Sequence, residues 1–173
     1  PMFHCHVWCY PLTLAMLHAR VICIRNIRAK EIFELISEHK ITHFGGAPII
    51  LNMLANAPKE EQIKLNHKVY VLTAAAPPPS IIFKKMKELG FEVMHVYGLT
   101  ETYGHILQCA WNSKWDKLNE DEKADISSRQ GVRYPNTEDV KVMNPENMKT
   151  VPNDGKTIGE IMIRGNVVMK GYF

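Results

Sequence analysis

The chain is organised around Tyr97-Gly98-Leu99-Thr100-Glu101-Thr102. An apolar run from Phe91 to Val96 precedes this stretch and Gly90 ends a helical pattern before the run, so the six residues are predicted to form a loop at the carboxyl end of a strand. Open α/β sheets bind their ligands at that edge. The stretch offers an aromatic face, a glycine, two hydroxyls and one carboxylate, which suit a nucleotide with its metal, and Glu101 is the natural oxygen ligand. Taken alone, the six residues fit a polar turn between two strands equally well.

Strands and helices are predicted to alternate before this stretch. Short β-branched and apolar runs favour strands, and apolar residues spaced three to four apart favour helices. Pro48 suits the first position of a helix. In chain order we expect a buried strand at 21–24, an amphipathic helix at 29–40, a strand at 41–44, a helix from Pro48 to Ala55, a buried strand at 69–73 and a helix from Ser80 to Leu89.

Two turns of small residues follow predicted strands. Gly45-Gly46 would let backbone come close to a neighbour, and residues 74–79, Ala-Ala-Ala-Pro-Pro-Pro, follow the strand at 69–73. Small side chains in the second turn would let a planar ring lie on the backbone. Tight packing of the next helix onto the sheet explains them nearly as well, and the neighbouring 97–102 stretch favours the ligand.

The pattern changes after the 97–102 stretch. We expect a surface excursion over 103–130, with a short helix opened by a capping box of Asn119 and Glu122. The rest is predicted to be all β, with strands at 139–143, 157–164 and 167–169. The predicted fold class is therefore α/β, a layered fold of alternating strands and helices, with 1–130 as its central part and 131–173 as the start of a β-rich subdomain.

Composition excludes several classes of protein. The 173 residues are 46% hydrophobic, which allows the core of one domain and excludes disordered and fibrous proteins. The net charge of +3 comes from scattered lysines and arginines, so we expect no nucleic-acid partner. The longest apolar run, residues 12–24, is too short to span a bilayer and no cleavable signal opens the chain, so we expect a cytoplasmic protein with its four cysteines reduced.

Potential zinc ligands lie near the start of the chain: His4, Cys5, His6 and Cys9. No paired C-x-x-C spacing and no second cluster accompany them, so a packed helix entrance is favoured over a zinc site. The chain opens inside an apolar run and ends at Gly171-Tyr172-Phe173 with no fading of the pattern, so we expect the middle of a longer polypeptide.

Six ordered segments match one family: Pro-Met-Phe-His at 1–4, Thr-His-Phe-Gly-Gly-Ala-Pro at 42–48, Ala-Ala-Pro-Pro-Pro at 75–79, the 97–102 stretch, Gly-Glu-Ile-Met-Ile-Arg-Gly at 159–165 and Gly-Tyr at 171–172. Over essentially its whole length the chain resembles the adenylate-forming acyl-CoA synthetases, which include aryl-CoA ligases, luciferases and the adenylation domains of peptide synthetases. It looks most similar to the fatty-acid and short-acyl ligases. Six ordered matches are far more specific than any one of them.

The resemblance implies a two-step ligase reaction. A carboxylate attacks the α-phosphate of ATP to give an acyl-adenylate, and coenzyme A then displaces AMP to form a thioester. The implied partners are a small-molecule carboxylic acid, ATP with Mg²⁺, and coenzyme A, and short or medium aliphatic acids, including thioether acids, are the leading substrates. The resemblance is also compatible with a homo-oligomer of the intact enzyme.

The resemblance also implies roles for individual residues. The catalytic residues would be Glu101 as the magnesium ligand, Thr100 bonding the phosphates, and His4 near the acyl carboxylate. The nucleotide contacts would come from Ala75, Ala76, Pro77, Tyr97, Gly98, Leu99, Thr100 and Thr102. The acyl tunnel or its supports would come from Trp8, Gly45, Gly46, Ala47 and Pro48.

The chain departs from the family pattern at two places. Close relatives usually have Asn-Gly in place of His6-Val7 and Gly in place of Ala75, which affects the tunnel width and the closeness of the adenine contact. The family's phosphate loop would precede Pro1, and its ribose motif, hinge and catalytic lysine would follow Phe173, so we expect this piece alone to be inactive. Two alternatives remain: a non-catalytic nucleotide-binding scaffold, and another adenylate-forming class such as an aryl-CoA ligase or a peptide-synthetase adenylation domain.

Overall fold

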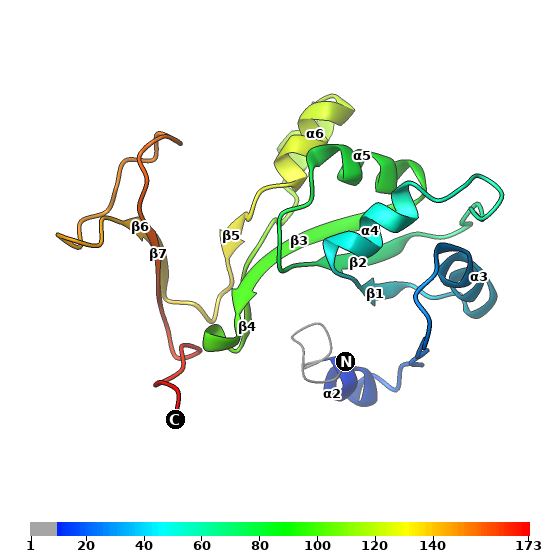
Figure 1. The fold of residues 1–173 in the computed structure, drawn as a ribbon, viewed down its shortest axis with the longest axis horizontal. Coiled ribbons are helices and arrows are strands. Elements are labelled where there is room, and N and C mark those ends of the chain that lie inside the picture. Colours follow the sequence, from blue (N-terminus) through cyan, green and yellow to red (C-terminus); the bar gives the residue numbers. More distant parts are fainter. Residues whose placement is uncertain (1–9) are drawn as a thin grey trace.

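A computed structural model describes residues 10–173 and places them in a mixed α/β fold (Figure 1), which confirms the predicted fold class. Its helices are α2 (Tyr10–Met16), α3 (Ala29–His39), α4 (Pro48–Ala55), α5 (Ser80–Glu88) and α6 (Glu120–Ser127), with the 3₁₀ turns η1 (Thr100–Thr102) and η2 (Ser113–Lys117). Its strands are β1 (His43–Gly45), β2 (Val69–Thr73), β3 (Phe91–Leu99), β4 (Gly104–Gln108), β5 (Val132–Arg133), β6 (Asp139–Met143) and β7 (Glu160–Arg164).

The described strands form two sheets. β1 to β5 lie in chain order in one sheet, and β6 pairs with β7 in the other. β1 and β2 are parallel, as are β2 and β3, and parallel neighbours need a crossover, which α4 and α5 supply. β4 and β5 continue the sheet with antiparallel pairing. The carboxyl ends of β1, β2 and β3 therefore point the same way.

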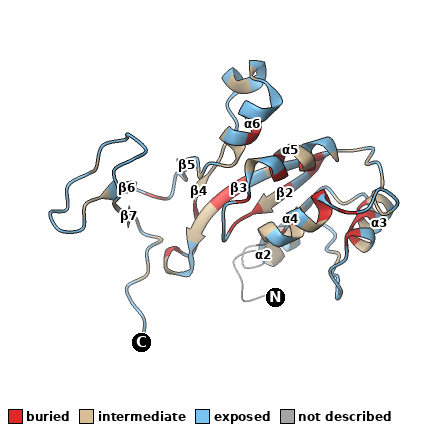
Figure 2. Ribbon diagram, turned by 45° about the horizontal axis from the view of Figure 1, so that its top comes forward, coloured by how far each residue is buried: buried red, intermediate tan, exposed pale blue. Residues whose placement is uncertain are grey.

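The main core lies between this sheet and helices α3, α4 and α5 (Figure 2). Phe33 of α3, Leu51 of α4 and Phe91 of β3 are almost completely buried, and the rings of Phe33 and Phe91 lie 5.9 Å apart. Ile32 and Ile36 are buried on α3 as the helical spacing predicts. Burying each such side chain contributes about 1.5–3 kcal/mol. This core fixes the strands whose ends carry the predicted site.

β3 changes its partner part-way along its length. Residues up to His95 pair in parallel with β2, and those from Val96 onward pair antiparallel with β4, with a register shift between Tyr97 and Gly98. The prediction of a loop over all of 97–102 is therefore wrong for the first three residues, which belong to β3. A glycine inside a strand often marks such a bulge, because it admits a close neighbouring backbone.

β4 occupies part of the predicted surface excursion. Its Ile106 is fully buried and the strand extends the sheet, so the prediction is wrong for these residues. The capping box that follows is confirmed. The Asn119 side chain accepts hydrogen bonds from the backbone N–H groups of Asp121 and Glu122 at 3.0 and 2.9 Å, and the Glu122 carboxylate accepts one from the N–H of Asn119 at 3.0 Å.

Two predicted strands are wrong. Residues 21–24 and 167–169 form no strand in the described part of the chain. Both contain β-branched residues, which fit a pleated surface, but a strand also needs a neighbour for its backbone groups. Val21 and Ile24 are exposed, so the predicted burial is wrong as well.

β6 and β7 form an antiparallel hairpin to one side of the main sheet in Figure 1, with Asp139 opposite Arg164 and Met143 opposite Glu160. β5 follows the predicted domain boundary after residue 130, yet it pairs with β4 in the main sheet. The division into 1–130 and 131–173 stays a prediction.

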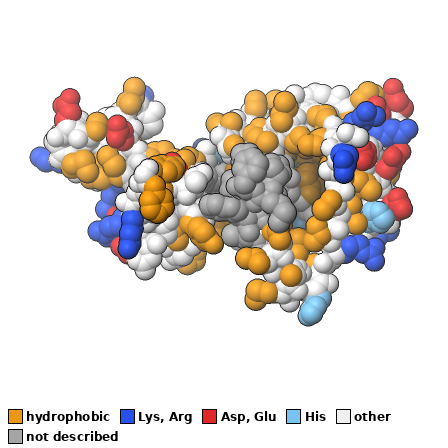
Figure 3. Space-filling view, turned by 60° about the horizontal axis from the view of Figure 1, so that its bottom comes forward, with side chains coloured by type: hydrophobic (Ala, Val, Ile, Leu, Met, Phe, Trp, Pro, Cys, Tyr) orange, Lys and Arg blue, Asp and Glu red, His pale blue; other side chains and the backbone are white. Residues whose placement is uncertain are grey.

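Much apolar surface is exposed. Figure 3 shows hydrophobic side chains spread over one face and charged side chains mainly toward its two ends. Leu12, Met16 and Leu17, in and just after α2, are among the exposed large side chains. Apolar surface of this kind is typical of protein–protein contacts. None of the helices between Tyr10 and Phe173 has the length and apolar character needed to cross a membrane.

Candidate functional site

Three of the predicted site segments lie at one edge of the main sheet. Residues 45–48 follow the carboxyl end of β1, residues 75–77 follow that of β2, and residues 97–102 form the end of β3 and the η1 turn. Because these strands pair in parallel, their carboxyl ends share one edge (Figure 1). Ligands of open α/β sheets bind at this edge.

The turn after β1 is tightly packed. The backbone N–H of Gly46 donates to the carbonyl oxygen of Leu72 in β2 at 3.0 Å. Gly46 is buried, and a Cβ on it would stand 3.3 Å from the Cβ of Ile50 in α4. Pro48 begins α4, as predicted, because the first helical position needs no backbone donor. The turn thereby fixes where α4 starts against the sheet.

The turn after β2 has a strained backbone. Ala75 has a φ of 83°, a region that glycine enters freely and L-residues seldom do. This is the position at which the family pattern usually has glycine. Ala75, Ala76 and Pro77 are all exposed. Their small side chains leave the backbone of the turn open to a flat ligand.

The η1 turn is held from inside by Thr102. The Thr102 hydroxyl is buried, accepts a hydrogen bond from the N–H of Leu99 at 2.9 Å, and lies 2.9 Å from the carbonyl oxygen of Gly104, to which it can donate. The Thr102 hydroxyl therefore makes its hydrogen bonds, as acceptor and as donor, to the backbone of the turn itself. Thr100 is exposed, and its hydroxyl makes no hydrogen bond to any residue from Tyr10 onward.

Met169 and Tyr172 both form hydrogen bonds with Glu101. The Tyr172 hydroxyl donates to Oε1 of Glu101 at 2.6 Å, and the Met169 N–H donates to the Glu101 carbonyl oxygen at 2.8 Å. The hydrogen bond from Tyr172 lowers the pKa of the Glu101 carboxyl and raises the pKa of the Tyr172 phenol, because it stabilises the carboxylate. Within residues 10–173, no lysine, arginine or histidine forms an ion pair with Glu101.

Gly98 faces the neighbouring backbone. A Cβ on Gly98 would overlap the carbonyl oxygen of Gly104 and come within 2.6 Å of the Cα of His105. The space beside Gly98 is therefore filled by β4. Tyr97, one residue earlier, is half-buried and pairs with Leu107.

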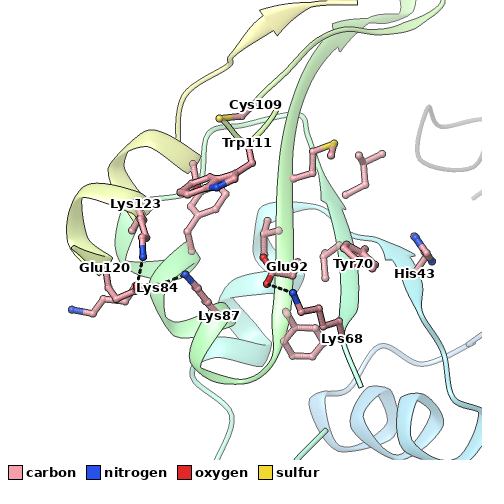
Figure 4. A pocket seen from close by; sticks show the side chains of 18 of the residues that line it. His43, Lys68, Tyr70, Lys84, Lys87, Glu92, Cys109, Trp111, Glu120 and Lys123 are labelled. Atoms are coloured by element: carbon pink, nitrogen blue, oxygen red, sulfur yellow. Dashed lines mark hydrogen bonds and ion pairs between the residues drawn. The ribbon is translucent and has the colours of Figure 1, made fainter. Parts of the chain in front are cut away.

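A groove of about 690 Å³ lies elsewhere, between the sheet and helices α5 and α6 (Figure 4). The lysines that line it are paired with acids. Lys68 is 3.6 Å from Glu92, and both Lys87 and Lys123 are within 3 Å of Glu120, which holds the pKa of Glu120 at about 2. None of the predicted site residues lines this groove, and its paired charges leave little net positive potential for an anion.

The structure places the predicted residues 45–48, 75–77 and 97–102 at one edge of the main sheet, whereas His4, Trp8, His6 and Val7 lie outside the described residues. Tyr172 could not be predicted as a neighbour of Glu101. It belongs to the Gly-Tyr segment at 171–172, but nothing in the local pattern of either residue indicates a contact across 71 positions. Among the described residues, no cluster of three or more His, Cys, Asp or Glu could hold a metal ion.

These features fit a nucleotide-binding enzyme, and the chain belongs to the AMP-binding enzyme family, whose family model matches residues 1–173. It is 52% identical over 174 residues to the peroxisomal acetate/butyrate–CoA ligase AAE7 of Arabidopsis thaliana and 50% identical over 174 residues to the acetate–CoA ligase CCL3 of Humulus lupulus. Each match covers 99% of this chain. The chain spans 30% of the length of both relatives.

A solved structure has the same fold. The o-succinylbenzoate coenzyme A synthetase MenE of Bacillus subtilis, in complex with ATP and magnesium, matches with a TM-score of 0.75 at 20% identity. The match covers 100% of this chain and 33% of that chain. At this identity the likeness shows the fold alone.

Proposed function

We propose that this chain is the central part of an AMP-forming acyl-CoA synthetase, which uses ATP to activate a carboxylic acid and transfers the acyl group to coenzyme A. One observation carries the proposal: segments 45–48, 75–77 and 97–102 lie at the edge of the sheet where the parallel strands end, in a chain of the AMP-binding family. The two plant relatives support it, since both are named as acid–CoA ligases.

The nucleotide site proposed here uses the two exposed turns. Adenine lies on Ala75, Ala76 and Pro77, with Tyr97 along its other face, because small exposed side chains and an aromatic ring suit a planar base. The exposed Thr100 hydroxyl bonds the phosphates. Leu99 and Thr102 contribute to the contact by fixing the backbone of the η1 turn, in which the Thr102 hydroxyl is engaged.

The residues of the η1 turn fit a magnesium ion. Mg²⁺ is usually held by one or two carboxylates, with phosphate oxygens and water supplying the other ligands. Glu101 offers one carboxylate without a cationic partner in the described chain, beside the exposed Thr100. When bound, the ion would offset phosphate charge. The part played by this chain is to hold the Glu101 oxygen atoms in a fixed place.

The acyl group is proposed to lie along residues 45–48, with His4 near the reacting carboxylate and Trp8 beside the tunnel. Short or medium aliphatic acids, including thioether acids, are the proposed substrates. The names of the two plant relatives, which act on acetate or butyrate, support short chains. These same residues would also exclude water from the acyl-adenylate.

The test uses the full-length protein that contains this chain. It is incubated with ATP, Mg²⁺, coenzyme A and one acid at a time, from acetate to octanoate and with cinnamate, and AMP and thioester are measured by chromatography. We expect both products in equal amounts, highest with a short acid. ATP binding without AMP release for any acid would overturn the proposal in favour of a non-catalytic scaffold. A preference for cinnamate would identify the aryl-CoA class instead.

The compartment is a separate proposal. The sequence favours the cytoplasm, and both described cysteines, Cys23 and Cys109, are free thiols, as is usual there. The Arabidopsis relative is named as peroxisomal. Microscopy of the full-length protein with a fluorescent tag at its amino terminus, beside a peroxisomal marker, tests the proposal: diffuse signal supports the cytoplasm and co-localised spots exclude it.

A further inference from the structure

We propose that Tyr172 is a positioning residue for Glu101, which orients the Glu101 carboxylate toward the magnesium ion of the bound nucleotide. This inference rests on the proposed function, because it assumes that Glu101 meets magnesium and ATP. Tyr172 lies outside the three site segments, and the resemblance implies no role for it.

The contact is short and directional. The Tyr172 hydroxyl lies 2.6 Å from Oε1 of Glu101, within the range of a charge-assisted hydrogen bond between a hydroxyl and a carboxylate. The Met169 N–H also donates to the Glu101 carbonyl oxygen at 2.8 Å. One segment of four residues therefore holds both the backbone and the side chain of Glu101.

The chemistry of the donor favours a positioning role. A lysine or arginine at this place would neutralise Glu101 and compete with a metal ion, whereas a phenol orients one carboxylate oxygen and leaves the negative charge in place. The inner side of the same turn is held by Thr102, whose hydroxyl accepts the Leu99 N–H. A glutamate fixed in this way loses less side-chain freedom when it binds a metal, so the binding is stronger.

The structure also argues against a purely packing role for the phenol. Tyr172 is 73% exposed, so its ring buries little surface in the described chain. The hydroxyl accounts for the side-chain hydrogen bond to Glu101, and removing it leaves the ring in place. Tyr172→Phe is therefore a clean test of the hydrogen bond.

The experiment uses the full-length protein and its Tyr172→Phe variant. ATP binding is measured by calorimetry over a magnesium series, without acid or coenzyme A, and the rates of the two half-reactions are measured separately. We expect Tyr172→Phe to raise the magnesium concentration needed for half-maximal ATP binding by about tenfold, the effect of one hydrogen bond to a charged group. Adenylate formation should slow at low magnesium and recover at high magnesium, while thioester formation from supplied acyl-adenylate changes little.

Two further variants make the result specific. Tyr70→Phe removes a phenol hydroxyl from the far end of β2 and should leave the magnesium dependence unchanged. In a Glu101→Gln background, Tyr172→Phe should have no further effect on the magnesium dependence, because the oriented charge is already gone.

The outcomes separate the inference from the function on which it rests. A wild-type protein that binds ATP with magnesium but forms no thioester would overturn the proposed function and still allow the magnesium series to be read. An active wild type whose magnesium dependence is the same with Tyr172→Phe would overturn the inference. A lower melting temperature with equal losses in both half-reactions and an unchanged magnesium dependence would also overturn it, since Tyr172 would then only anchor its segment.

Discussion

Gly98 of β3 lies directly against the backbone of Gly104 in β4. A Cβ on Gly98 would overlap the Gly104 carbonyl oxygen and approach the Cα of His105 to 2.6 Å. The same two strands shift their register between Tyr97 and Gly98, next to this close approach. The glycine in this stretch therefore has a structural reason that does not depend on a ligand.

Gly98→Ala should destabilise the full-length protein by about 3 kcal/mol, because the backbone of β4 must move to admit the methyl group. The measurement is urea unfolding followed by fluorescence. Gly155→Ala is a suitable comparison: Gly155 has a φ of 67° but no atom near its missing Cβ, so the cost there is conformational only, about 1 kcal/mol. Equal small costs at both positions would contradict the close approach.

The alternation of strands and helices from residue 29 to residue 96 could be predicted because each element carries its own pattern. α4 begins at its proline, and α5 is followed by Gly90 at a φ of 93°. β4 could not be found in the same way, since it has five residues of which Ile106 alone is a fully buried hydrophobic. At residues 21–24 the error is the reverse: the sequence predicts a strand, but these strand-forming residues have no neighbouring strand to pair with.

The site could be predicted in its segments but not in its internal contacts. Parallel strand order brings the turns after β1, β2 and β3 to one edge, and strand order follows from alternation. The hydrogen bond between Glu101 and Tyr172 depends on how the chain after β7 returns to the η1 turn. No periodicity encodes that return. The use of the Thr102 hydroxyl inside the turn is likewise invisible in the sequence.

Ala75→Gly should stabilise the protein by about 0.5–1 kcal/mol. At a φ of 83°, glycine avoids the cost of a left-handed backbone, which is about 1–2 kcal/mol for an L-residue. Glycine also raises the conformational entropy of the unfolded chain, and this offsets part of the gain in stability. Ala76→Gly, one residue later in the same turn and without a positive φ, should lower stability by about 0.5–1 kcal/mol. Thermal unfolding of both variants checks the opposite signs, and a loss with Ala75→Gly would contradict the strain.

His95 should make the folded state sensitive to acid. The side chain is 1% exposed, and its Nδ1–H donates to the Ser128 carbonyl oxygen at 2.9 Å. Burial lowers the pKa of His95 below its ordinary value, although the hydrogen bond opposes this. The unfolded chain, with a histidine pKa of about 6.5, therefore binds a proton that the folded chain resists.

Stability from this group should be constant above about pH 6.5 and fall as the pH drops below it, by at most about 1.4 kcal/mol per pH unit. Urea unfolding of the wild type and of His95→Gln between pH 5 and pH 8 tests this. The variant should be less stable at pH 8 because it loses the packing against Phe83, but its stability should fall less steeply with acid. Parallel profiles for the two proteins would assign the acid sensitivity to other groups.

Glu101→Gln should impair adenylate formation far more than thioester formation. Gln keeps the size of Glu and a carbonyl oxygen that can still accept from the Tyr172 hydroxyl, so the η1 turn and residues 169–172 should stay in place. It removes the charge that would hold magnesium at the phosphates. Losing one strong electrostatic contact in a transition state costs on the order of 3 kcal/mol, or about a hundredfold in rate.

Rapid-mixing measurements of the two half-reactions over a magnesium series separate this role from a structural one. Release of pyrophosphate accompanies the first step and not the second, so thioester formation from supplied acyl-adenylate should slow only a few-fold. Glu146→Gln, at an exposed carboxylate in the turn between β6 and β7, should leave both steps and their magnesium dependence unchanged. If Glu101 serves only to anchor Met169 and Tyr172, Glu101→Gln should be tolerated or should slow both steps equally with an unaltered need for magnesium, and the ligand assignment would then be wrong.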